Sequence, residues 1–286
     1  MEISIQGVKG AFHEEAARQY FAEDISIKPH LNFTQLVDAV DKRESDYGII
    51  AIENTISGTI HNNLNLIRQS DLHIIGEVYL RIQQNLAVLP GTSIQDLQYV
   101  NSHYMAINQC REFFSNFPKI KLTDAEDTAL SMQQIAEQNL QYTGGIGSKL
   151  AAKYYGLEII AESIETNKKN YTRFLILEKD IEESSDFNKA SLVLFLPHKR
   201  GSLANILSII NFYNINLSKI ESVPVIGEPW HYMFYLDVLF ENTKDYFNML
   251  QAIEPLTDQL NVLGNYQNGQ EKFIQKNHYE SSRQNQ

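Results

Sequence analysis

Residues 170–177 read Asn-Tyr-Thr-Arg-Phe-Leu-Ile-Leu, a stretch that is polar in its first half and apolar in its second. A strand that starts polar and becomes apolar typically leads from a ligand-binding edge into a hydrophobic core. Arg173 carries a planar set of donors suited to a carboxylate, and Thr172 beside it can donate one hydrogen bond. Two interpretations of this segment stay open: a ligand site, or a strand edge at which Arg173 pairs with a structural acid.

Strand-like and helix-like patterns alternate over the first 178 residues. Strands are expected at 3–5, 25–28, 47–52, 85–89, 98–101, 120–123 and 145–147, and helices at 13–21, 33–42, 60–69, 105–114, 129–137 and 150–155. Such repeated βα units predict mostly parallel sheets, with ligands bound beyond the carboxyl ends of the strands. The length of this region favours two α/β lobes with a cleft between them.

The remainder of the chain has a different pattern. Residues 179–189 are acidic and poor in large apolar groups, which indicates a linker. The expected order that follows is strand 191–196, helix 202–212, strand 215–225, strand 231–240, helix 244–253 and strand 260–266. This βαββαβ order predicts a separate α+β domain at 190–267. Residues 268–286 are polar and expected to be disordered.

Composition excludes several kinds of partner and site. A net charge of −11 argues against nucleic acid and anionic membranes as partners. Cys110 is the only cysteine, so no intramolecular disulfide or thiolate metal cluster can form, and the eight histidines show no metal-ligand spacing. No signal peptide is evident, and no apolar run approaches the roughly 20 residues that span a bilayer. We therefore expect a cytoplasmic protein without a metal.

Polar residues follow the apolar strand expected at 47–52. Glu53 and Asn54 lie where a parallel sheet binds ligands, so we interpret both as site residues. Thr55 is instead expected to cap the next helix.

Another polar pair, Ser102-His103, opens the helix expected at 105–114. Ser102 is expected to be its N-cap, with His103 in the first turn. The free N–H groups of a helix start would also hold a substrate carboxylate, and Gln109, seven residues from Ser102, could reach the same side. Cys110 is expected to be a small core residue.

Acidic residues precede the helix expected at 129–137. The helix dipole explains Asp127 and Thr128, whereas Glu126 either shares that role or orients the active site. The glycines at 144–147 indicate close backbone packing. Gly7 and Gly10 lack the spacing of a dinucleotide-binding loop, so any chemistry must depend on hydrogen bonding and charge placement.

Together, and in this order, the clusters resemble the prephenate dehydratase family from Gly7 to about Tyr266. The shared motifs are Gly7-x-x-Gly10-x-Phe12 with Ala16-Ala17, Ile52-Glu53-Asn54 with Gly58, Ser102-His103 with Gln109-Cys110, Tyr155-Gly156-Leu157, and Asn170-x-Thr172-Arg173-Phe174. The C-terminal region resembles an ACT regulatory domain through Gly201-Ser202-Leu203 and Glu221-Ser222-x-Pro224.

The resemblance implies an α/β protein with a catalytic domain at 1–178, whose two lobes are similar to a type II periplasmic binding protein. An α+β, ferredoxin-like ACT domain would follow. The implied reaction is the decarboxylating dehydration of prephenate to phenylpyruvate in phenylalanine biosynthesis, without a cofactor. Prephenate would bind between the lobes, and phenylalanine would inhibit through the ACT domain. A homodimer or homotetramer is the expected assembly.

The same resemblance assigns roles to individual residues. Thr172 would hydrogen-bond or protonate the leaving hydroxyl, and Arg173 would anchor a carboxylate. The expected catalytic residues are Thr172, Glu53, Asn54, Ser102 and Gln109, the last four through binding and positioning. The other expected substrate-binding residues are Phe174, Asn170, Glu126 and His13. The expected phenylalanine-binding residues are Gly201, Ser202, Leu203, Glu221 and Ser222.

Six positions depart from the family pattern. Ala51 and Tyr104 both stand where Pro is usual. Ala11 and His13 stand where Thr and Ser are usual, and His13 is expected to take over an anion contact. Arg200 and Val223 stand where Pro and Arg are usual in the regulatory domain, which leaves phenylalanine binding open. Two other functions also stay open: an arogenate dehydratase, and a non-enzymatic, two-lobed binding protein that senses an amino acid.

Overall fold

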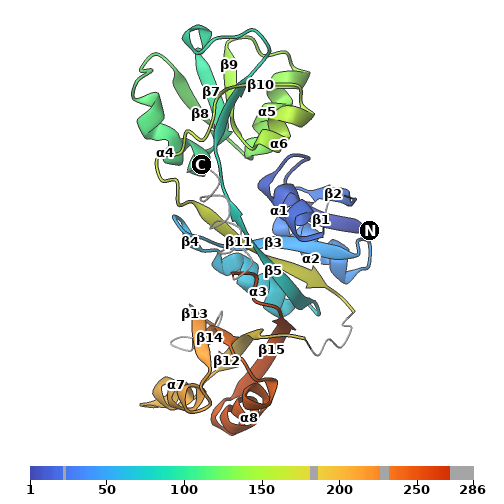
Figure 1. Cartoon of the computed structure of the whole chain (residues 1–286), viewed down its shortest axis with the longest axis vertical. Coiled ribbons are helices and arrows are strands. Elements are labelled where there is room, and N and C mark those ends of the chain that lie inside the picture. Colours follow the sequence, from blue (N-terminus) through green and yellow to red (C-terminus); the bar gives the residue numbers. More distant parts are fainter. Residues whose placement is uncertain (22–23, 181–185, 226–231, 271–286) are drawn as a thin grey trace, which may run out of the picture. The chain divides into compact units, whose positions relative to one another are not determined.

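The computed structural model describes residues 1–21, 24–180, 186–225 and 232–270. This part of the chain is a mixed α/β fold with three sheets (Figure 1). It divides into two compact units, each built from two stretches of chain. Unit 1 combines residues 1–63 with 79–174, and unit 2 combines 64–78 with 175–286.

The first sheet has the strand order β2-β1-β3-β11-β5, with the short β4 paired to β3. Its elements and the helices between them are β1 (Glu2–Gln6), α1 (Phe12–Phe21), β2 (Ser26–His30), α2 (Phe33–Asp41), β3 (Tyr47–Asn54), β4 (Gly58–Thr59), α3 (His61–Gln69), β5 (His73–Arg81) and β11 (Tyr171–Glu178). β1 runs parallel to both β2 and β3, as the βα pattern predicts. β5 and β11 each continue from one unit into the other.

The second sheet belongs wholly to unit 1 and has the order β10-β6-β9-β7-β8. Its elements are β6 (Asn85–Val88), β7 (Tyr99–His103), α4 (Tyr104–Phe114), β8 (Lys121–Ala125), α5 (Thr128–Glu137), β9 (Thr143–Gly147), α6 (Lys149–Tyr154) and β10 (Glu158–Ala161). β7 is parallel to β8 and β9, but β6 is antiparallel to β9 and β10. The expectation of mostly parallel strands is therefore wrong for β6 and β10. These two strands carry the connections to the first sheet and share no βα crossover with their neighbours.

Glycine permits close backbone approach at two places in unit 1. Gly10 has φ +87°, and a Cβ there would lie 2.5 Å from the Cα of Ala151 in α6. The Ser148 hydroxyl donates a hydrogen bond to the Gly10 carbonyl at 2.5 Å, which ties the turn after β1 to the start of α6. In β9, a Cβ on Gly145 would lie 3.0 Å from the Met132 side chain, which confirms the close packing predicted there.

The C-terminal part of unit 2 has the βαββαβ order that the sequence predicts. Its elements are β12 (Lys189–Phe195), α7 (Ser202–Phe212), β13 (Asn216–Pro224), β14 (Tyr232–Leu239), α8 (Thr243–Ile253) and β15 (Gln259–Tyr266). The antiparallel sheet order is β13-β14-β12-β15, and the two helices pack on it around buried Leu192, Ile206 and Tyr246. Parts of three predictions lie outside the described residues, namely His231 of the third strand, 181–185 of the linker and 271–286 of the tail.

A buried ion pair lies in unit 2. The Lys189 ammonium on β12 is 2.8 Å from the Glu77 carboxylate on β5, and both side chains are fully buried. The Gly269 N–H donates to the same carboxylate at 2.9 Å. Gly264 permits the close contact of β15 with β5, because a Cβ there would lie 2.0 Å from the Ile74 carbonyl oxygen.

Candidate active site

Four side chains in unit 1 form a continuous hydrogen-bonded network at the polar ends of β3 and β11. The Asn54 amide nitrogen lies 2.8 Å from Asn170 Oδ1 and 2.9 Å from Thr172 Oγ1. The Asn170 amide nitrogen donates in turn to Gln109 Oε1 at 2.9 Å. Asn170 is fully buried and Thr172 is 8% exposed. The structure thus brings together two residues of the 170–174 segment with Asn54 and Gln109, which are distant in sequence.

Backbone contacts fix the direction of this network. Asn54 Oδ1 accepts from the N–H groups of Ile56 at 2.9 Å and Ser57 at 3.0 Å, so the amide nitrogen must face Thr172. An amide N–H can only donate, so Thr172 Oγ1 accepts this bond. The hydroxyl proton of Thr172 is consequently available to a further acceptor. Thr172 can therefore donate to a ligand while it accepts from Asn54.

Thr55 does not cap a helix, contrary to the prediction. Its hydroxyl donates to the Lys169 carbonyl and accepts from the Tyr171 N–H, both at 2.9 Å. The next helix, α3, begins only at His61, beyond the reach of Thr55. The hydroxyl instead joins the end of β3 to the start of β11.

The N-cap predicted at Ser102 is also wrong, because β7 continues through His103. His103 is the N-cap of α4, and its ring accepts from the Met105 N–H at 3.4 Å. Ser102 is fully buried and donates to the Ile146 carbonyl at 2.7 Å, so it lies outside the amide network. Cys110 is a core residue as predicted, and burial raises the pKa of its thiol to about 12.

Arg173 and Thr172 lie on opposite faces of β11, because successive residues of a strand alternate in direction. Arg173 is 5% exposed, and its guanidinium lies 5.9 Å from the centre of the Tyr79 ring. Phe174 shares the face of Thr172 and contacts His13 edge-to-face, with ring centroids 5.0 Å apart. The role of Arg173 as a carboxylate anchor stays a prediction.

His13 lies in an apolar environment at the start of α1. Its ring packs against Phe33 and Phe174, and burial lowers the pKa of His13 to about 3. The imidazole is therefore neutral near pH 7. Its buried Nε2 has no hydrogen-bond partner within the described ranges. The anion contact expected of His13 would therefore be a neutral hydrogen bond.

Glu53 and Glu126 are the two acidic residues predicted for the site. Glu53 is half-buried on β3, opposite Thr59 of β4. Glu126 is exposed between β8 and α5. Asp127 caps α5 and accepts from the Leu130 N–H at 2.9 Å, as the helix-dipole interpretation predicts.

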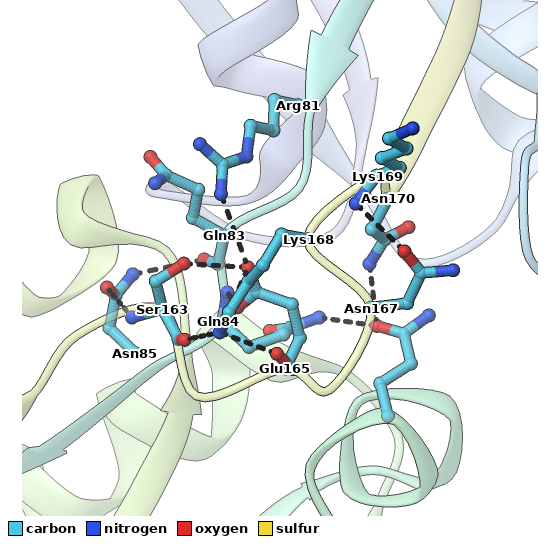
Figure 2. Close-up of polar contacts among 11 residues, drawn as sticks. Arg81, Gln83, Gln84, Asn85, Ser163, Glu165, Asn167, Lys168, Lys169 and Asn170 are labelled. Carbon is cyan, nitrogen blue, oxygen red and sulfur yellow. Dashed lines mark hydrogen bonds and ion pairs between the residues drawn. The ribbon is translucent and has the colours of Figure 1, made fainter. Parts of the chain in front are cut away.

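Sequence reasoning missed the residues that support this network. Figure 2 shows Gln84, on the segment that connects β5 to β6, and Glu165, on the segment that connects β10 to β11. The Gln84 amide donates to Gln109 Oε1 at 3.3 Å, and Glu165 accepts from the Gln84 backbone N–H at 2.9 Å. The only sign of Glu165 in the sequence is an acidic residue in a loop, five residues before Asn170. It belongs to no periodic pattern, so the sequence does not mark it as a site residue.

A pocket in unit 2 is lined by two of the residues expected to bind phenylalanine, Ser202 and Leu203. Its volume is about 130 Å³, and it is lined by Leu196, Pro197, His198, Lys199, Ser202, Leu203, Tyr232 and Phe234. Gly201 precedes α7 with φ +83°, and the Ser202 hydroxyl donates to the Pro197 carbonyl at 2.8 Å. Glu221 and Ser222 lie on β13 and are not among the lining residues.

No three His, Cys, Asp or Glu side chains of the described residues come together as a metal site. None of the helices in the part of the chain that the structure describes has the length and apolarity required to cross a bilayer.

The described part of the chain is thus a mixed α/β protein with a hydrogen-bonded network of amide and hydroxyl groups. The chain belongs to the prephenate dehydratase family, whose members are enzymes that catalyse the dehydration of prephenate: the family model "Prephenate dehydratase" matches residues 3–182. A bifunctional chorismate mutase/prephenate dehydratase of Enterobacter agglomerans is 32% identical over 92% of this chain and 70% of that protein.

Two further similarities extend across nearly the whole chain. Arogenate dehydratase/prephenate dehydratase 2 of Arabidopsis thaliana is 33% identical over 93% of this chain and 72% of that protein. The solved structure of prephenate dehydratase from Arthrobacter aurescens, in complex with L-Phe, is 25% identical with a TM-score of 0.85, and the match covers 100% of both chains.

Proposed function

We propose that this chain converts prephenate to phenylpyruvate, and that Thr172 donates the hydrogen bond that assists departure of the ring hydroxyl. The C–C bond to the ring carboxylate breaks and releases CO2, its electron pair enters the ring, and the C–O bond on the opposite side breaks. The departing hydroxide takes up a solvent proton and becomes water. Aromatisation supplies the driving force. The observation that carries the proposal is the hydrogen bond that Thr172 accepts from Asn54, because it leaves the Thr172 proton to be donated to the substrate.

The proposed contribution of Thr172 is electrostatic. A threonine hydroxyl is a weak acid, so it stabilises charge on the leaving oxygen rather than transferring a proton completely. Asn170 and Gln109 hold the network in place and orient the substrate. The remaining proposed roles are positioning by Glu53 and Ser102, carboxylate binding by Arg173, and substrate contacts by Phe174, Glu126 and His13.

We infer that the catalytic domain spans 1–178, with two lobes of the type II periplasmic-binding-protein kind. The linker would be 179–189, and the ferredoxin-like ACT domain 190–267. Phenylalanine would bind beside Gly201, Ser202 and Leu203, with Glu221 and Ser222 completing the site in a homodimer or homotetramer. Support comes from the βαββαβ order, the pocket near Ser202 and the L-Phe complex of the Arthrobacter aurescens protein. We expect the enzyme in the cytoplasm.

The test is turnover of prephenate and arogenate by the full chain, with product identified and phenylalanine added in a parallel series. Phenylpyruvate from prephenate, reduced by phenylalanine, is the expected result. Preferred turnover of arogenate would assign the alternative activity carried in the name of the Arabidopsis relative. Recovery of both compounds unchanged after binding would indicate a non-enzymatic sensor.

A further inference from the structure

Glu165 is a fully buried carboxylate in the segment between β10 and β11. One of its oxygens accepts from the Gln84 backbone N–H at 2.9 Å, and the other accepts from the Ser163 hydroxyl at 2.7 Å. Two cations lie near the second oxygen, with Arg81 at 3.9 Å and Lys168 at 4.0 Å. Figure 2 shows these groups around Glu165. A buried carboxylate is tolerated when hydrogen bonds and opposite charges compensate for lost hydration, as here.

Glu165 joins the two segments that connect the sheets of unit 1. The Ile164 N–H also donates to the Gln84 carbonyl, at 2.7 Å, so both backbone groups of Gln84 bind the 164–165 segment. Lys168 strengthens this segment because its ammonium donates to the carbonyls of Ser163 and Glu165. These contacts fix where the Gln84 side chain begins.

The Gln84 side chain connects the 164–165 segment to the candidate active site through its hydrogen bond to Gln109. It is 3% exposed and donates to Gln109 Oε1, which also accepts from Asn170. Its own Oε1 is buried without a hydrogen-bond partner in the part of the chain described. An unsatisfied buried acceptor is costly and uncommon, which suggests that this amide is retained for its one bond to Gln109.

We propose that Glu165 is a positioning residue for the reaction and acts through Gln84 on Gln109. By holding Gln84 against the 164–165 segment, Glu165 sets the position of the Gln109 amide and, through Asn170 and Asn54, of the Thr172 hydroxyl. This inference rests on the proposed dehydratase function. It adds a residue that touches neither the substrate nor the reacting atoms.

The experiment compares wild type, Glu165→Ala and Glu165→Gln for phenylpyruvate formation from prephenate. We expect Glu165→Ala to lower kcat about 30-fold with KM changed less than about threefold, because displacement of about 1 Å has effects of this size. Glu165→Gln keeps an oxygen that can accept from the Gln84 N–H, and should restore kcat to within about fivefold of wild type. Glu162→Ala is the matched control, an exposed acid nearby that pairs with Lys149 at 2.7 Å.

A double-mutant cycle separates positioning from general stability. In a Gln109→Ala background, Glu165→Ala should cost less than about threefold in kcat, since residues acting through one contact are not additive. An undiminished loss in that background, or wild-type kcat in Glu165→Ala, would overturn the proposal.

If Glu165→Ala does not fold, Gln84→Met provides the second test. It keeps the backbone bonds to 164–165 but removes the amide donor, so the same loss of kcat is expected, and an unchanged kcat would refute the proposal. Absence of wild-type turnover on prephenate and arogenate would instead overturn the proposed function on which the inference rests.

Discussion

The role that we propose for Thr172 depends on the residue that faces it, Asn54. A threonine hydroxyl has one proton to donate and two lone pairs, and the Asn54 amide donates to one of these lone pairs at 2.9 Å. Asn54 is itself oriented by two backbone N–H groups, so the direction of the Thr172 bond originates in the turn after β3. Local backbone geometry thus sets the direction of the hydrogen bond between Asn54 and Thr172.

The first prediction concerns a substitution that reverses the direction of the hydrogen bond between Asn54 and Thr172. Asn54→Asp keeps the acceptor for Ile56 and Ser57 but places a second acceptor against Thr172. The threonine proton would then turn toward the carboxylate and away from the substrate, and we expect kcat to fall about 100-fold. Steady-state kinetics on prephenate measure the loss, with Asn116→Asp, an exposed asparagine, as the control. Equal kcat in Asn54→Asp and wild type would contradict the assigned direction of this hydrogen bond.

The second prediction concerns Glu15, whose pKa burial raises to about 7, against weaker opposing hydrogen bonds from Leu150 and Ser148. The folded state therefore binds this proton more tightly than the unfolded state. Stability associated with Glu15 is complete below the unfolded value of about 4.5 and is lost as pH rises through about 7. Glu15→Gln should raise the Tm at pH 8 and leave it nearly unchanged at pH 4. The exposed Glu112→Gln should shift neither value, and a pH-independent effect of Glu15→Gln would refute the explanation.

At the scale of elements, periodicity predicted most helices and strands within one or two residues, because their apolar positions face a core. The helices at α5, α7 and α8 are examples. It missed β10, which has one exposed and three partly buried residues, and β4, which has two residues. It also left β5 (His73–Arg81) unassigned. Thr55 and Ser102 were assigned to caps, but their partners Lys169 and Ile146 are distant in sequence. Local capping rules cannot anticipate such partners.

Packing of the turn after β1 against α6 gives the third prediction. Gly10→Ala should destabilise the protein by about 3 kcal/mol, because φ is positive and the new Cβ meets the Ala151 backbone. Gly156→Ala is the matched control, with φ +66° but nothing within 4 Å of the Cβ, and should cost about 1 kcal/mol. Urea unfolding measures both. Equal losses would show that conformation alone, and not the contact with α6, requires glycine at position 10.

At the scale of the whole molecule, the ion pair between Lys189 and Glu77 was not foreseeable, because 112 residues separate its members. Lys189→Met should destabilise the protein by about 3–5 kcal/mol, since it leaves a buried carboxylate without its cation. The double variant with Glu77→Leu should recover most of the loss, as an apolar pair of similar size often replaces a buried ion pair. Urea unfolding of the single and double variants tests this, and a double variant no more stable than Lys189→Met would contradict it.

Family membership and fold class could be reached from the sequence because polar clusters follow strands in a fixed order. The segment that carries Thr172 could be reached as well, but the orientation of its hydroxyl could not, since it depends on a contact between Asn54 and Thr172 across 118 residues. The contacts of Glu165 could not be predicted for the same reason, because its bond to Gln84 spans 81 residues.

The most direct test of the central claim is phenylpyruvate formation from prephenate by wild type, Thr172→Val and Thr172→Ser. Valine keeps the shape of threonine without the hydroxyl, and serine keeps the hydroxyl. We predict that Thr172→Val loses at least about 100-fold in kcat and that Thr172→Ser stays within about tenfold of wild type. A folded Thr172→Val enzyme with wild-type kcat would contradict the account.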